Sequence, residues 1–197
     1  MSTMTTLLGL NTEELRILAR DAGQPAYRGT QIAKWLYRHG VRSYDEMTNL
    51  PEALRTELAR THDIGRARVT ATQHSNDGTV KLLLTLSDGS TVETVGLPYE
   101  DRLSCCLSTQ VGCPVGCAFC ATGLSGFTRN LTAGEMIDQV LAVQEAVHVT
   151  KERSDSHTRI DHVTFMGMGE PLLNYEATLR AAHLLNDEVG IAMRHLT

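Results

Sequence analysis

The pattern of hydrophobic and polar residues predicts helices first and strands later along the 197-residue chain. Between residues 11 and 60, apolar side chains recur at the spacing of amphipathic helices. Four short helices are predicted, and they begin at Asn11, Thr30, Ser43 and Pro51. Asn11 and Ser43 are each followed three residues later by a glutamate, which is the pattern of a capping box. Because each apolar face is short, these helices are expected to pack on one another or on the next segment.

The next part of the chain alternates between apolar and polar residues, which is typical of strands. Three strands are predicted, at residues 66–74, 79–86 and 91–97. The two connections between them contain Asp77-Gly78 and Asp88-Gly89, and Asp-Gly is a strong hairpin signal. The sequence therefore predicts an antiparallel β-meander after the helical segment.

From residue 103 onward, predicted strands alternate with predicted helices. The predicted elements are strands at 103–108, 160–166 and 191–197 and helices that begin at Thr132 and Asn174. Alternation of this kind predicts a parallel sheet, with the functional residues in the loops at the carboxyl ends of its strands. The segment 150–159 is polar and is expected to be mobile. The chain is thus predicted to have three parts: a helical module (1–62), the β-meander (63–100) and an α/β core (101–197).

Composition narrows the class of protein. With 42% hydrophobic and 21% charged residues, the chain has the composition of a soluble globular protein. No apolar run approaches the ~20 residues of a membrane-spanning helix, and the first residues lack the basic and apolar regions of a signal peptide. Five cysteines are an odd number, which argues against a disulfide scaffold. We therefore expect a cytoplasmic, monomeric protein that does not bind membranes.

The charges are distributed unevenly. Residues 1–68 carry 10 basic and 8 acidic side chains, whereas residues 69–197 carry 8 basic and 15 acidic ones. Between residues 22 and 44 there are four basic side chains and no acidic one, with aromatic residues interleaved, a pattern that can bind phosphates and stack bases of RNA. The predicted RNA-contacting residues are Arg28, Lys34 and Arg38. The same pattern also fits a solvated helix face with Trp35 partly in the core.

Three cysteines within eight residues are the main candidate for a metal or cluster site. Cys113, Cys117 and Cys120 are spaced C-x3-C-x2-C. Three thiolates are one fewer than a [4Fe–4S] cluster takes when it only carries electrons. One iron would remain open to a substrate or cofactor, as one position of a catalytic zinc does. A zinc site is the alternative, although zinc sites more often show paired C-x2-C units.

A glycine-rich turn is the second candidate. Gly167-Met168-Gly169-Glu170-Pro171 follows a predicted strand and precedes a predicted helix, as the cysteine loop does. Glycines let the backbone approach a ligand closely, and Glu170 offers oxygen atoms to an ammonium group. Because the carboxyl ends of parallel strands meet at one edge of a sheet, both loops are expected on the same rim.

These motifs resemble those of the radical S-adenosylmethionine (SAM) enzymes, and in finer detail those of the RlmN family. The segments that carry the resemblance to RlmN are Val92–Val95, Cys106–Cys113, Gly126–Thr132 and Phe165–Asn174. That family comprises bacterial methyltransferases of adenine C2 in 23S ribosomal RNA and certain transfer RNAs. The resemblance therefore implies an α/β fold, namely a partial radical-SAM (βα) barrel that stops after about two βα units.

The resemblance also implies a role for each matching residue. Cys113, Cys117 and Cys120 would bind the [4Fe–4S] cluster, and Phe119 would pack beside the adenine of SAM. Gly169 and Glu170 would contact SAM. Glu93 would be the base that removes the C2 proton once a methyl carbon, carried on a protein cysteine, has been attached. Cys106 would resolve the resulting protein–RNA crosslink as a thiol. A flavodoxin-like reductant is the implied electron donor.

The chain departs from the family in one respect. No cysteine follows Cys120, whereas the methyl-accepting cysteine of the family lies near its C-terminus. We therefore expect an N-terminal fragment that cannot methylate RNA alone. Two other functions remain open from the residues: another radical SAM enzyme, such as an adenine-C8 methyltransferase or an activase, and a zinc-stabilised RNA-binding module.

Overall fold

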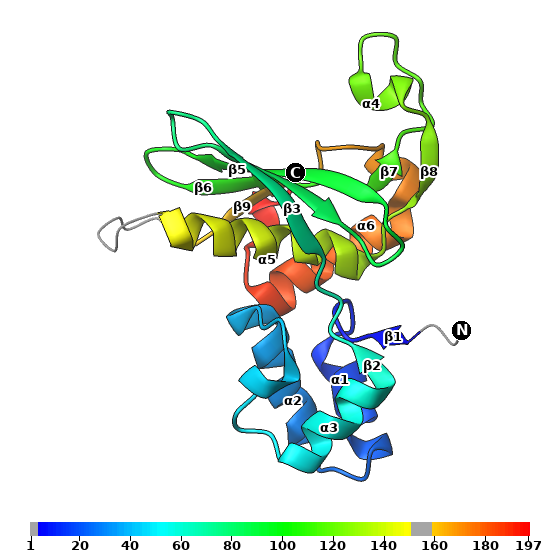
Figure 1. Cartoon of the computed structure of the whole chain (residues 1–197), viewed down its shortest axis with the longest axis vertical. Helices are drawn as coiled ribbons and strands as arrows, with labels where there is room; N and C mark the ends of the chain where they lie inside the picture. The colour runs from blue at the N-terminus through cyan, green and yellow to red at the C-terminus, as the bar shows by residue number, and fades with distance from the viewer. Residues whose placement is uncertain (1–3, 151–158) are drawn as a thin grey trace.

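The structure is a computed structural model, and it describes residues 4–150 and 159–197. The segment 150–159, for which mobility is predicted, lies almost entirely outside these residues. A helical module forms one end of the molecule, and a sheet with two long helices beneath it forms the other (Figure 1). None of the described helices is both long and apolar enough to cross a membrane.

The helical module contains three α-helices and two short strands. Its helices are α1 (Thr12–Asp21), α2 (Tyr27–Lys34), a π-helical continuation (Trp35–His39), a 3-10 helix (Tyr44–Glu46) and α3 (Glu52–Thr61). Its strands, β1 (Thr5–Thr6) and β2 (His62–Asp63), pair in parallel. Both predicted capping boxes are confirmed, at Asn11 and at Ser43, although Ser43 opens a 3-10 helix rather than an α-helix.

The predicted start of the second helix at Thr30 is wrong. The helix begins at Tyr27, and its first backbone hydrogen bonds run from Arg28 to Pro25 O and from Gly29 to Ala26 O. Pro25 and Ala26 thus accept the first amide hydrogen bonds of the helix, ahead of the predicted start. Gly29 lies so close to α1 that a Cβ atom there would stand 2.4 Å from the carbonyl of Leu15.

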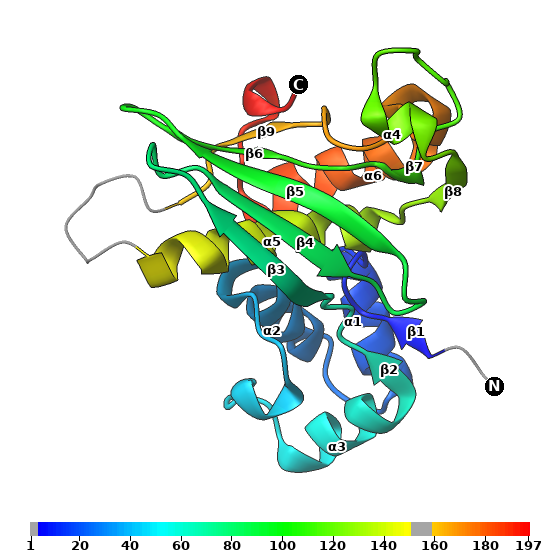
Figure 2. The ribbon, with the colours of Figure 1, turned by 45° about the horizontal axis from the view of Figure 1, so that its top comes forward.

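Five strands form the main sheet in the order β3-β4-β5-β6-β9 (Figure 2). They are β3 (Arg68–His74), β4 (Val80–Thr85), β5 (Thr91–Pro98), β6 (Leu103–Cys106) and β9 (His162–Thr164). The first four are antiparallel, which confirms the predicted meander, whereas β6 and β9 are parallel. A separate hairpin of β7 (Gln110–Gly112) and β8 (Phe127–Asn130) follows β6 and carries the short helix α4 (Ala121–Leu124).

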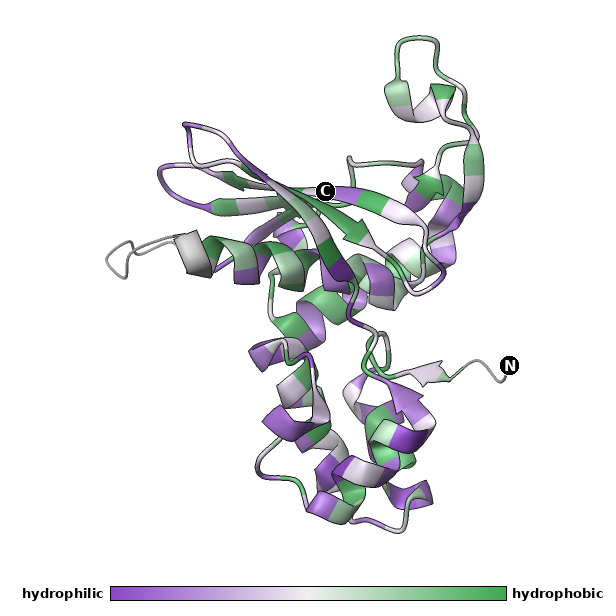
Figure 3. Cartoon of the chain, in the orientation of Figure 1, coloured by the Kyte–Doolittle hydropathy of each residue, from purple (hydrophilic) through white to green (hydrophobic). Residues whose placement is uncertain are grey.

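Helices cover one face of this sheet. The long helix α5 (Ala133–Thr150) crosses β4 and β5, and its ribbon is predominantly hydrophobic (Figure 3). A Cβ atom on Gly96 would lie 2.6 Å from Val143 Cγ1, so helix and strand are in close contact. Helix α6 (Tyr175–Leu184), continued by a π-helical turn (Leu185–Val189), packs against α5. Side chains on the opposite face of β4 and β5 are partly exposed.

The predicted strand at 191–197 is wrong over most of its length. Residues Met193–His195 form a 3-10 helix, in which the amide of His195 donates to Ala192 O. The ring of His195 stacks on His162, with 4.0 Å between the ring centroids, so this turn packs against the start of β9. Only the last two residues run alongside β9, where Thr197 N donates to Val163 O at 3.0 Å.

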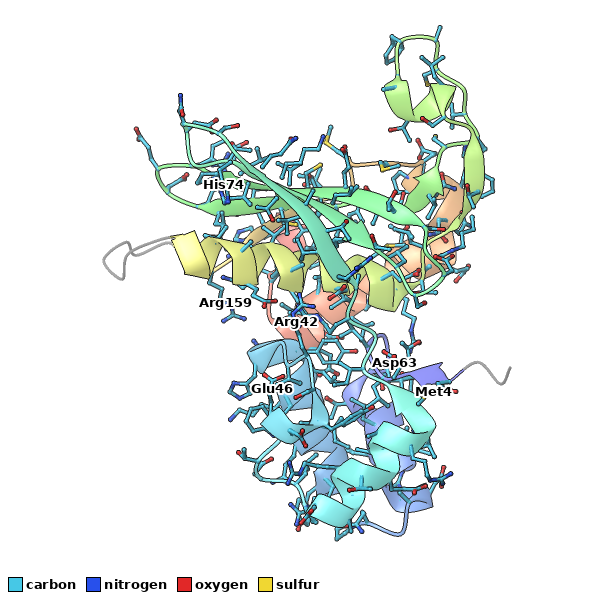
Figure 4. All side chains as sticks on the ribbon, in the orientation of Figure 1. Met4, Arg42, Glu46, Asp63, His74 and Arg159 are labelled. Atoms are coloured by element: carbon cyan, nitrogen blue, oxygen red, sulfur yellow. The ribbon has the colours of Figure 1, made fainter. Side chains whose placement is uncertain are left out.

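A buried ion pair lies at the junction of the helical module and the sheet domain. The guanidinium of Arg66 contacts Asp138 on α5 and the carbonyl of Gly40, and the two charged side chains are only 4% and 3% exposed. Arg42, labelled at the junction in Figure 4, reaches from the helical module to Glu145 on α5. A continuous hydrophobic core runs through both parts. The helical module is therefore held in one orientation relative to the sheet.

Candidate active site

The open face of the sheet brings the predicted base and the predicted thiol together. Cys106 pairs directly with Val95 across β6 and β5, and Glu93 lies two residues from Val95. Because side chains alternate between the faces of a strand, Glu93, Val95 and Cys106 share the face that α5 does not cover. Both Glu93 and Cys106 are partly exposed there.

Cys105 lies on the opposite, covered face. Its side chain is fully buried beside Thr94, with the two polar atoms 3.5 Å apart. Burial raises the pKa of the Cys105 thiol to about 12, because the charged thiolate is poorly solvated there. Of the two adjacent cysteines, Cys106 is therefore the one that could react with a ligand on the open face.

Lys81 extends the open face by one strand. It lies directly opposite Val95, and its ammonium nitrogen stands 2.7 Å from Glu93 Oε1. Their side chains are 41% and 46% exposed, so the ion pair adds little to stability. Its consequence is geometric, since it holds the Glu93 carboxylate over β4.

The Gly167–Pro171 turn lies against the segment that follows β6. Thr109 N donates to Met168 O at 2.8 Å, and Glu170 N donates to Gln110 Oε1 at 2.9 Å. The carboxyl ends of β6 and β9 are therefore adjacent, as the sequence predicts. The Glu170 carboxylate accepts a hydrogen bond from Leu172 N at 3.0 Å and caps the helical turn that follows.

The first and third residues of this turn must be glycine for reasons of space. A Cβ atom on Gly167 would stand 2.7 Å from the carbonyl of Leu107, and one on Gly169 would stand 2.6 Å from Gln110 Cβ. Gly169 also has a φ of +102°, a conformation that other residues rarely adopt. Close packing between the two loops is therefore a structural reason for both glycines, independent of any ligand.

The cysteine loop connects β7 to β8 and projects away from the sheet (Figure 1). Cys113 N donates to Gly126 O at 2.9 Å at the base of the loop, and Cys120 N donates to Cys117 O at 3.1 Å near α4. Phe119 is 93% exposed. Its predicted partner, an adenine ring, would have to bind on the outer surface of this loop.

The three loop cysteines fit an iron–sulfur cluster by their chemistry but are not gathered around one point. All are free and partly exposed. Hydrogen bonds from the backbone N–H groups of Gly123 and Thr122 lower the pKa of Cys120, which favours the metal-binding thiolate. Among residues 4–150 and 159–197, however, no three metal-binding side chains converge. Their assignment as cluster ligands stays a prediction.

Two of the three predicted RNA-contacting cations already have partners within the fold. Arg28 donates to Gln31 Oε1 at 2.8 Å, and Arg38 donates to Val189 O at 2.6 Å. Lys34 is exposed on the surface of α2. Trp35 is partly buried and donates to Asn49 Oδ1 at 2.6 Å, so its indole helps to hold the module together.

Two residues of the site were missed by sequence reasoning. Lys81 carries no motif, and only the strand register brings it to Glu93. Gln110 falls inside a segment that carries the resemblance to RlmN, but its contact with Glu170 depends on how two loops pack. Hydrophobic alternation could have placed Lys81 on the Glu93 face, whereas no local signal identifies the contact of Gln110.

The chain is similar to known proteins over nearly its whole length. Residues 5–64 match the family model of the ribosomal RNA large subunit methyltransferase N-terminal domain. The proteins named probable dual-specificity RNA methyltransferase RlmN from Thermosynechococcus vestitus and Gloeobacter violaceus are each 50% identical to the chain. The alignments cover 97% and 98% of this chain but 54% and 53% of those relatives. The chain thus spans about half the length of the curated relatives it matches.

The fold is also similar to that of a solved structure. The crystal structure of a radical SAM methyltransferase from Sphaerobacter thermophilus superposes with a TM-score of 0.88 at 40% sequence identity. The superposition covers 98% of this chain and 55% of that protein. The fold is therefore the mixed α/β fold of a radical SAM methyltransferase over the length compared. On this sequence and structural evidence, the chain belongs to the RlmN family.

Proposed function

We propose that this chain forms part of a radical SAM methyltransferase that methylates adenine C2 in 23S ribosomal RNA and in certain transfer RNAs. The observation that carries this proposal is the shared open face of Glu93 and Cys106, with Cys105 buried on the other face. A base and a thiol on one face suit a reaction that removes a proton from carbon and then breaks a bond to a protein cysteine. The names of the relatives support the substrate class.

Adenine C2 requires more than ordinary methyl transfer, because it is electron-poor and is not a nucleophile. When bound, a [4Fe–4S] cluster and SAM would supply the methyl group and the radical chemistry. Cys113, Cys117 and Cys120 would hold the cluster, since they are free, accessible thiols within one loop. Gly169 and Glu170 would contact SAM at the adjoining turn. Phe119 would cover its adenine.

The two residues on the open face would complete the reaction. Glu93, held by Lys81, would accept the C2 proton after the methyl carbon has been attached through a protein cysteine. Cys106 would then attack the sulfur of that cysteine. A transient disulfide forms as the carbon–sulfur bond breaks, and the electron pair of the broken bond passes to the methyl carbon, which takes up a proton.

We also propose a role for each part of the chain. The strands β6 and β9 and the helices α5 and α6 would be the first two βα units of a barrel whose inner wall is the open face of the sheet. The helical module (1–62) would contact RNA through Arg28, Lys34 and Arg38, and the meander (63–100) would join it to the core (101–197). The electron donor would be a flavodoxin-like reductant.

The adjacent cysteines offer a matched test. The protein that contains this chain is purified anaerobically, its iron content is determined, and methylation of adenine in 23S ribosomal RNA is measured by mass spectrometry. Cys106→Ala and Glu93→Gln are expected to abolish methylated product with unchanged iron content, whereas Cys105→Ala keeps activity. Equal loss in Cys105→Ala and Cys106→Ala, or full activity of Cys106→Ala, would contradict the proposal.

A further inference from the structure

The residues that lead from β6 into β7, Ser108 to Gln110, are polar, yet they are completely buried. Ser108, Thr109 and Gln110 are 0%, 1% and 1% exposed. Polar groups in such a position are costly unless they are hydrogen-bonded. The side chains of Ser108 and Gln110 have such partners, whereas the Thr109 hydroxyl has none. The partners of Ser108 and Gln110 therefore show what this segment holds in place, and none of the roles proposed above uses these side chains.

Gln110 uses both ends of its amide to join two different loops. Its Nε2 donates to Asn130 Oδ1 on β8 at 2.7 Å, and its Oε1 accepts from Glu170 N at 2.9 Å. Gly169 lies directly against the Gln110 side chain, where a Cβ atom would be only 2.6 Å away. One side chain thus contacts the hairpin that carries the cysteine loop and the Gly167–Pro171 turn.

Ser108 extends the same hydrogen-bond network to the backbone of Glu93, the proposed general base. Its hydroxyl donates to Glu93 O at 2.6 Å and accepts from Met168 N at 2.8 Å. Gln139 on α5 binds the backbone of Ser108 on both sides, donating to its carbonyl and accepting from its amide. The turn is therefore held at Met168 by Ser108 and by the amides of Thr109 and Gln110, and at Glu170 by the Gln110 side chain. The Gln110 side chain extends to the hairpin strand β8, from which Asn130 Nδ2 also makes a longer contact with Leu173 O, at 3.4 Å.

We propose that Gln110 is a positioning residue that couples the Gly167–Pro171 turn to the β7–β8 hairpin, so that the SAM-contacting turn and the cysteine loop keep one relative position. This role of the residue for catalysis rests on the function proposed above. The coupling itself is a property of the chain without cofactors, and it can be measured independently of that function.

The coupling is tested by hydrogen exchange, followed by NMR on the 197-residue chain without cofactors. Asn130→Asp is the control, because it removes only the 3.4 Å contact of Asn130 Nδ2 with Leu173 O. Asn130→Ala also removes the hairpin end of the bridge but leaves the contact between Gln110 and Glu170 N intact. The Glu170 amide is expected to exchange on the order of tenfold faster in this variant, although its own acceptor is unchanged. An unchanged exchange rate at Glu170, or equal acceleration in Asn130→Asp, would overturn the proposal.

Gln110→Met tests both ends at once, and Tyr37→Phe is its matched control. Tyr37 is also a buried bridge, because its hydroxyl accepts from Gly9 N and donates to Leu10 O in the helical module. Gln110→Met is expected to accelerate exchange in both 127–130 and 167–171, whereas Tyr37→Phe leaves both segments as in the wild type. Acceleration of only one segment in Gln110→Met, or equal acceleration in Tyr37→Phe, contradicts the coupling.

A second measurement addresses the link to SAM. In the anaerobically reconstituted protein, Gln110→Met is expected to raise the Kd for SAM at least about tenfold with unchanged iron content, because the turn is no longer held by the bridge. An unchanged Kd beside altered exchange would remove the catalytic role and leave the coupling. Failure of the wild type to bind SAM would instead refute the proposed function, without affecting the exchange result.

Discussion

At the scale of single residues, strand alternation gives two adjacent cysteines opposite environments. Cys106 faces the open side of the sheet beside Val95, whereas Cys105 is buried against Thr94. Their chemical identity is the same, so the difference in reactivity arises only from burial and its effect on the thiolate.

Alkylation of the native chain by iodoacetamide at pH 8 is expected to modify Cys106 and to leave Cys105 unmodified. The pKa of Cys105 is about 12, so its thiol remains neutral at pH 8, and its sulfur is inaccessible. Peptide mass spectrometry after a timed reaction measures both sites. Cys105 should become reactive on unfolding in urea, and equal labelling rates in the folded chain would contradict the assigned faces.

Asp88 predicts a pH dependence of stability. The Arg129 guanidinium, 2.6 Å away, lowers the pKa of this carboxyl to about 2, from about 3.9 in an unfolded chain. A lowered folded-state pKa stabilises the fold above the unfolded value, and this contribution is lost as pH falls toward 2. Asp88 is 42% exposed, so the contribution at pH 7 is expected to stay below about 1 kcal/mol.

The measurement compares Asp88→Asn with the wild type by urea unfolding between pH 7 and pH 3. The variant should be less stable at pH 7, and the difference should shrink as pH falls below about 4, where the unfolded carboxyl becomes protonated. A difference that stays constant over this range would show that the ion pair with Arg129 is not its origin.

At the scale of elements, the hairpin that carries the cysteine loop depends on a close backbone approach. Gly112 has a φ of +75°, and a Cβ atom there would stand 1.9 Å from Gly126 O. Gly126 has a nearly equal φ of +76°, but a Cβ atom there would meet no other atom within 4 Å. Substitution of the two glycines therefore allows the cost of backbone strain to be measured separately from the cost of crowding.

Gly112→Ala is expected to destabilise the chain by about 2–5 kcal/mol, because it combines strain at positive φ with overpacking. Gly126→Ala should cost only about 1–2 kcal/mol, from strain alone. Both values come from the free energy of unfolding in urea. Equal losses in the two variants would contradict the close approach of the two backbones.

At the scale of the whole molecule, Arg66 joins the helical module to α5, because its guanidinium contacts both the carbonyl of Gly40 and Asp138. Removal of one partner leaves the other charge buried and unpaired, so Asp138→Leu is expected to cost about 3–5 kcal/mol. The double variant Arg66→Met/Asp138→Leu should recover more than half of this loss, because it leaves no buried charge. A double-mutant cycle by urea unfolding measures the coupling.

Glu145 supplies the control for this cycle. It contacts Arg66 at 3.3 Å but is 50% exposed, so Glu145→Gln should change stability by less than about 1 kcal/mol. A loss in Glu145→Gln as large as that in Asp138→Leu would show that the exposed part of the cluster, rather than the buried pair, joins the two parts of the molecule.

Much of the fold was predictable because its signals are local. The capping boxes at Asn11 and Ser43 and the two Asp-Gly turns each depend on a few neighbouring residues, and all four are present in the structure. The errors occurred where packing outweighs local preference. The second helix starts before Thr30, and the predicted strand at 191–197 gives way to a turn that packs on His162.

The sequence by itself determined the secondary structure of most of the chain, the family resemblance and the candidate residues. Caps, turns and motif spacing depend only on residues that are close together in the sequence. Only the tertiary structure decided which cysteine faces the open side, that Lys81 meets Glu93, and that Gln110 bridges β8 and the Gly167–Pro171 turn. These contacts join residues 11 to 60 positions apart. They depend on strand register and loop packing, which no local pattern encodes.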